Sequence, residues 1–171
     1  MEGENVLQTV AEVAVAFAGF TGVVLAFGRR SDRAWSPMDI YRFRVLLGAS
    51  LQTLLLSLIP LLLYHSGASE RTTWAASSFL VCILLIVILT NDLRYLAPIR
   101  DQMARADRIL GVIVSVGFAC VFAAQVANVF GVFGSRAFAA YLGALIYYLT
   151  MASLMFLRLL SSVGLDSEDM P

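Results

Sequence analysis

The sequence predicts an all-α, polytopic membrane protein with five transmembrane helices. Of its 171 residues, 60% are hydrophobic and only 14% are charged, and the mean hydropathy is +0.82. Several runs of about 20 residues carry few charges, which is the length that a helix needs to cross a hydrocarbon core about 30 Å thick. We expect one transmembrane domain over residues 1–164 and an acidic flexible tail over 165–171.

The first two spans are expected at about 6–27 and 37–64. The N-terminus is acidic and no small-residue cleavage site follows a short apolar region, so the first span is expected to be retained. Ser36, Pro37 and Asp39 suit the N-cap, the first position and the third position of the second helix. Pro60 should kink this helix and free a carbonyl group at Leu56, with the nearby hydroxyls of Ser57 and Thr53 helping to satisfy that region.

The third span is expected at about 74–96, the fourth at 108–130 and the fifth at 136–160. The third is apolar around its whole circumference, which is typical of a helix that faces lipid on most sides. Pro98 interrupts the chain before the fourth span, and the glycine-containing turn GVFGS precedes the fifth.

The arginines predict the orientation in the membrane. All twelve cationic side chains are arginines, and ten of them fall on the side of the first loop, the third loop and the C-terminus. Positive loops stay in the cytoplasm, so we expect the N-terminus outside and the C-terminus in the cytoplasm. The multi-pass pattern resembles small proteins of the bacterial inner membrane.

Rows of small residues predict which helices pack closely. Helices in lipid associate where small residues let their backbones approach, and we therefore expect the first and fourth spans at the centre of the bundle. The rows serve either packing within the chain or a subunit interface in a homo-oligomer. Their members on the first span are Ala14, Ala18 and Gly22, continued by Ala26, and on the fourth Gly111, Ser115, Ala119, Ala123 and Ala127, continued by Gly131.

A layer of polar groups is expected about 8 to 10 Å below the outer boundary of the membrane. Its members, taken from four spans, are Glu12, Gln125, Ser57 and Tyr141, with Asn128 slightly shallower. A carboxylate at this depth binds a proton or cation on an outward-opening pathway, or is a structural tie to Gln125, Asn128 or Arg136, or is solvated because the helix begins later. Arg136 is the candidate charge partner.

At the opposite boundary, arginines surround Trp35. Arg29, Arg30 and Arg33 precede it, and clustered basic residues beside a helix end either anchor the helix or bind anionic lipid head groups. Both interpretations stay open.

The sequence carries no motif for several classes of function. The chain has one histidine, two separated cysteines and no lysine, and it carries no metal-ligand spacing, nucleophile motif or phosphate-binding loop. We therefore expect no metal, no cofactor, no nucleic-acid partner and no enzyme activity. The leading hypothesis is a self-associating protein that forms a path for ions or protons through the lipid bilayer. The alternative is a non-conducting accessory or scaffold subunit of a larger membrane partner.

Overall fold

The computed structural model describes residues 3–28, 36–98 and 105–164, and in these ranges it contains five long α-helices. They are α1 (Glu4–Gly28), α2 (Pro37–His65), α3 (Glu70–Leu96), α4 (Arg105–Val129) and α5 (Ala137–Gly164), with the short 3-10 helix η2 (Gly134–Arg136) before α5. All five are long and apolar enough to cross a membrane. The predicted all-helical class is confirmed, and the helices fit a multi-pass membrane protein.

Capping residues explain where α2 and α3 begin. The Ser36 side chain accepts a hydrogen bond from the Asp39 backbone N–H, and the Asp39 carboxylate accepts one from the Ser36 N–H, which forms a capping box. The α3 helix begins four residues before Trp74, because Ser69 caps it by accepting from the Thr72 N–H. The helix therefore begins before the predicted start of the third span at about residue 74.

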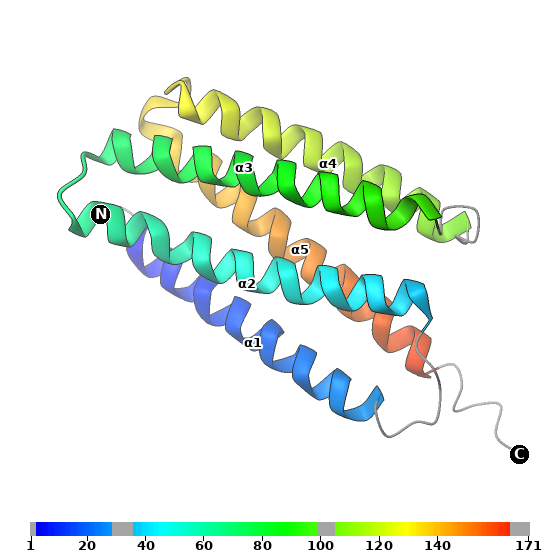
Figure 1. Ribbon diagram of the computed structural model, residues 1–171. Helices are drawn as coiled ribbons and strands as arrows, with labels where there is room; N and C mark the ends of the chain where they lie inside the picture. Colours follow the sequence, from blue (N-terminus) through cyan, green and yellow to red (C-terminus); the bar gives the residue numbers. More distant parts are fainter. Residues whose placement is uncertain (1–2, 29–35, 99–104, 165–171) are drawn as a thin grey trace, which may run out of the picture.

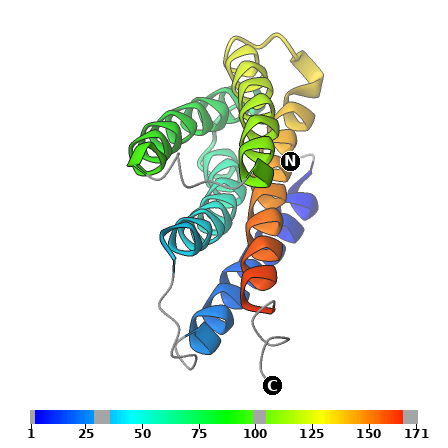
Figure 2. The same cartoon turned by 90° about the vertical axis from the view of Figure 1, so that its right-hand side faces the viewer.

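The helices lie in three layers, with α2 and α5 in the middle (Figure 1). The α2 helix packs most extensively against α1 and α5, whereas α4 packs against α3 and α5. Figure 2 shows α1 and α4 on different sides of this central pair. The prediction that α1 and α4 form the centre was wrong, because α2 packs against both α1 and α5 and most of the small residues of α4 stay exposed.

The apolar core runs along the inner faces of α2, α3 and α5. It includes Leu46, Leu56, Val81, Leu85 and Leu145, all almost fully buried. The prediction that α3 faces lipid on most sides was wrong for its first half, where buried hydroxyls lie on the inner face. The most exposed helix is α4.

The start of α1 and the end of α5 lie at opposite ends of the bundle (Figure 1). We call the end that holds the starts of α1, α3 and α5 the amino-terminal end, and the end that holds the starts of α2 and α4 the carboxy-terminal end.

Candidate functional site

Buried polar side chains gather between α2, α3, α4 and α5, most of them toward the amino-terminal end. Each is at most 2% exposed. They are Ser50, Thr53, Ser57, Thr73, Ser77, Ser78, Gln125 and Asn128.

Tyr141 crosses from α5 to the kink position of α2. Pro60 has no N–H to donate to the Leu56 carbonyl, and the Tyr141 hydroxyl donates to this oxygen over 2.6 Å. The Ser57 hydroxyl donates instead to the Thr53 carbonyl, and the Thr53 hydroxyl to the Ala49 carbonyl. The freed carbonyl was predicted from Pro60, whereas its partner comes from another helix and not from the neighbouring hydroxyls.

Gln125 and Asn128 tie α4 to the first turn of α5. The Gln125 side-chain amide donates to the Ala140 carbonyl over 2.8 Å, and the Asn128 amide donates to the Ala137 carbonyl over 3.0 Å. Asn128 also donates to the Ser78 hydroxyl of α3 over 2.9 Å. These α5 carbonyls can only accept, which fixes the orientation of both amides.

Both amide oxygens are left without a hydrogen-bond partner. The same holds for the hydroxyls of Thr73, Ser77 and Tyr148 among the described residues. Buried polar atoms are usually satisfied, so this part of the interior has acceptor capacity that the fold itself does not use.

Glu12 lies apart from this cluster. It is exposed on the face of α1 that points away from the bundle, and Gln8, one turn earlier, is exposed on the same side. Gln125, Asn128, Ser57 and Tyr141 are brought together inside the bundle, whereas Glu12 is not. The reason is rotational: α1 turns Leu7, Val10 and Ala14 toward the core, which leaves Glu12 on the opposite side.

The predicted charge partner of Glu12 is not brought to it either. Arg136 is exposed in η2, and among the described residues no ion pair joins it to Glu12. Arg29, Arg30 and Arg33, the candidate contacts for anionic lipids, lie outside the described residues.

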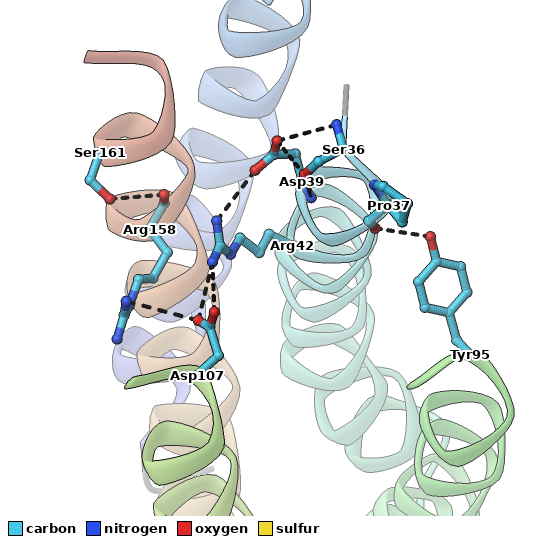
Figure 3. A network of polar contacts seen from close by, with 8 residues as sticks. All are labelled: Ser36, Pro37, Asp39, Arg42, Tyr95, Asp107, Arg158 and Ser161. Carbon is cyan, nitrogen blue, oxygen red and sulfur yellow. Dashed lines mark hydrogen bonds and ion pairs between the residues drawn. The ribbon is translucent and has the colours of Figure 1, made fainter. Parts of the chain in front are cut away.

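A second polar cluster, missed by the sequence analysis, holds the carboxy-terminal end together (Figure 3). Arg42 of α2 bonds Asp39 over 3.3 Å and Asp107 of α4 over 3.1 Å. Arg158 of α5 reaches Asp107 over 3.8 Å. The side chains of Arg42, Asp39 and Asp107 are only 11–13% exposed. The sequence signal for this cluster was the presence of two acidic residues, Asp39 and Asp107, in the first turns of helices among many arginines.

Aromatic groups extend this contact to α3. The Tyr95 hydroxyl donates to the Pro37 carbonyl, its ring stacks on Tyr41 with 5.6 Å between centroids, and the Arg44 guanidinium lies 5.2 Å from its centre. Arg42 and Arg44 thus each contact another helix, Arg42 through Asp107 of α4 and Arg44 through Tyr95 of α3.

The small-residue row of α4 points away from the bundle. Gly111, Ser115, Ala119 and Ala123 are exposed, and Ala127 is half-buried. The α1 row behaves differently, because Ala14 is buried, Ala18 is half-buried and Gly22 is exposed. The α4 row therefore does not serve packing within the chain along most of its length.

Among the described residues, no group of three or more His, Cys, Asp or Glu side chains lies close enough to hold a metal ion. Comparison of the chain with protein-family models, with curated proteins and with solved structures finds no match.

Proposed function

We propose that this protein self-associates in the membrane and forms a path for ions or protons between its subunits, with Glu12 on that path. The exposed position of Glu12 on α1 is the observation that carries the proposal. Glu12 follows the first residue of α1 by eight positions, about 12 Å along the axis. An ionisable side chain at such a depth is costly against lipid and marks ion or proton pathways.

The outward face of α1 supports an interface with a second helix. Exposed residues recur along it at alternating spacings of three and four, as in helices that pack side by side. We call this face the outward α1 stripe, and its members are Asn5, Gln8, Glu12, Val15, Gly19 and Gly22. A Cβ atom at either glycine would meet nothing within 4 Å in the same chain, so a neighbouring backbone has room to approach.

The polar half of this stripe explains how Glu12 is tolerated in an assembly. The Gln8 amide is both donor and acceptor, so Gln8 and Glu12 of adjacent copies are able to bond one another. The interior of one chain offers a poorer route, because the apolar core fills it between the two polar clusters. The path therefore lies between subunits rather than through one of them.

We assign the orientation and location in the same proposal: N-terminus outside, C-terminus in the cytoplasm, in a cell membrane of the bacterial inner-membrane type. The ten-to-two distribution of the arginines supports this assignment. A reporter fused to the C-terminus and active only outside the cell would contradict it.

Flux in liposomes tests the function. Purified wild-type protein is expected to conduct protons or monovalent cations, and Glu12→Gln is expected to reduce the flux to that of protein-free liposomes or to change its selectivity. The neutral amide keeps the shape of the side chain and removes its titratable charge. Ion-sensitive and pH-sensitive dyes trapped in the liposomes report both quantities.

Glu4→Gln is the matched control. It makes the same change at the first residue of α1, where Glu4 lies 3.8 Å from His65 at the amino-terminal end, and it should leave the flux unchanged. If well-folded wild-type protein shows no flux over a range of pH, salt and voltage, the conduction proposal is wrong.

The exposed small-residue row of α4 favours a second candidate, an accessory or scaffold subunit that docks a larger membrane partner. Ala119→Leu and Ala123→Leu are expected to leave the fold intact, because both sites are exposed, and to abolish association with another copy or with the partner by holding the helices apart. Cross-linking in native membranes, followed by purification, measures this.

Ala139→Leu, at an exposed site on α5, is the control for the added bulk. Unchanged assembly in the two α4 variants would remove the interface role of the row. A chain that purifies with a different protein, and conducts nothing, would favour the scaffold over the pore.

A further inference from the structure

A cavity of about 480 Å³ opens at the amino-terminal end, where the start of α3, the end of α4, η2 and the start of α5 meet. Its size lies in the range of small-molecule sites, about 300–1,000 Å³. Neither Glu12 nor the outward α1 stripe contributes to it. We call it the amino-terminal cavity, and the lining residues used below are Glu70, Arg71, Trp74, Asn128 and Gly131.

Arg71 supplies a positive charge at this cavity. Among the described residues no carboxylate lies within ion-pair distance of it. Its guanidinium lies beside Gly131, at φ +76°: a Cβ atom there would be in ordinary van der Waals contact, 3.5 Å from Nη2 and 3.6 Å from Nε. The guanidinium therefore lies against bare backbone at the edge of the cavity, with its donors available to an anion.

Glu70 supplies a negative charge at the same cavity. Its carboxylate lies 3.5 Å from the indole Nε1 of Trp74 and makes no ion pair among the described residues. Glu70 and Arg71 thus line one cavity with opposite charges that do not neutralise each other. A ligand that carries both signs of charge would match this arrangement.

Asn128 forms part of the wall of the cavity. It is 2% exposed, and its amide nitrogen is committed to Ala137 and Ser78. The carbonyl of Ala137 cannot donate, so the Asn128 amide cannot be turned over, and its Oδ1 remains an acceptor without a partner among the described residues. This oxygen is buried too deeply to contact a ligand, so Asn128 contributes to the wall of the cavity by tying α4 to α3 and α5.

We propose that the amino-terminal cavity binds a zwitterion in which a primary ammonium group is joined by a short linker to a phosphate. Arg71 binds the phosphate, and the Glu70 carboxylate accepts hydrogen bonds from the ammonium group. Phosphoethanolamine has this chemistry, either as a free molecule or as the head group of phosphatidylethanolamine. A trimethylated ammonium lacks the N–H donors for the hydrogen bonds to Glu70.

Trp74 provides a direct readout of binding. The chain has two tryptophans, Trp35 and Trp74, so Trp35→Phe leaves only the indole that lines the cavity. In detergent, free phosphoethanolamine is expected to change the Trp74 emission saturably, whereas phosphocholine is not. In lipid nanodiscs, phosphatidylethanolamine is compared with phosphatidylcholine in the same way. A response in detergent identifies the free molecule as a ligand, and one in nanodiscs alone identifies the lipid head group.

Variants separate the site from nonspecific effects. In the Trp35→Phe background, Arg71→Gln should weaken binding by roughly ten- to a hundredfold, because it removes a charge-assisted hydrogen bond. Arg136→Gln is the matched control, since Arg136 is exposed at the same end but does not line the cavity. Glu70→Gln should weaken ammonium binding while keeping an oxygen near the Trp74 indole.

Three results would overturn the proposal. One is the absence of a saturable Trp74 response to both sources in protein that circular dichroism shows to be folded. Another is equal binding of the ethanolamine and choline forms. The third is wild-type affinity in Arg71→Gln. None of these outcomes bears on flux through a path containing Glu12, so the two proposals fail independently.

Discussion

Arg42→Met is expected to destabilise the bundle by about 3 kcal/mol, the cost of leaving a largely buried carboxylate without its partner. Arg42 contacts both Asp39 and Asp107, and each of these carboxylates is nearly nine-tenths buried. Methionine retains the apolar stem that packs between α2 and α4 but removes the charge. Among the described residues Asp107 then keeps only Arg158 at 3.8 Å, which is too long to replace the bonds that are lost. Unfolding in mixed micelles, followed by circular dichroism, measures the change.

Two further variants distinguish lost pairing from lost packing. Arg94→Met changes an exposed arginine at the same end of the bundle, and its effect should stay within about 0.5 kcal/mol. Asp107→Asn should lower the free energy of unfolding less in the Arg42→Met background than in the wild type, because in that background it removes an unpaired charge. Strictly additive costs would show that the cluster does not act through pairing.

Tyr141→Phe is expected to cost about 1–3 kcal/mol, since it leaves the Leu56 carbonyl without a donor inside the bundle. Pro60→Ala should reduce this cost, because alanine restores the backbone N–H that reaches Leu56 in a regular helix. The wild type, the two single variants and the double variant form a double-mutant cycle, and the coupling free energy between Tyr141 and Pro60 is the quantity to measure.

Tyr148→Phe is the control on the same helix. Tyr148 is 3% exposed, but its hydroxyl has no hydrogen-bond partner among the described residues. Removing this hydroxyl should therefore leave stability unchanged or raise it slightly. If Tyr141→Phe behaves like Tyr148→Phe, the Tyr141 hydrogen bond does not stabilise α2.

The helices were predictable because their signals are local. Apolar length and the Ser36 capping box each depend on neighbouring residues, and the helices form where these signals lie. The four-residue error at α3 arose because Ser69 caps that helix inside a polar segment, where hydropathy alone gives no sign of a helix.

The arrangement of the helices was not predictable from the same signals. The row from Gly111 to Ala127 has the same sequence pattern whether it contacts a helix of the same chain, another subunit or lipid. The structure leaves most of this row exposed. Glu12 was grouped with Gln125 and Tyr141 from its depth alone, although depth carries no information about rotation around the helix axis. Gln125, Asn128 and Tyr141 do come together, because each one finds a backbone or side-chain partner across a helix boundary.

The central position of α5 has a consequence for synthesis on the ribosome. The Leu56 carbonyl and the amides of Gln125 and Asn128 all take their partners from residues 137–141, which emerge after them. While α1 to α4 are being synthesised, the Leu56 carbonyl and the Gln125 amide therefore remain unpaired in the nascent chain, and the Asn128 amide has only its bond to Ser78. Only the arrival of α5 satisfies them, so a chain stalled or cut before α5 would present unbonded polar groups that quality-control proteases and chaperones can recognise.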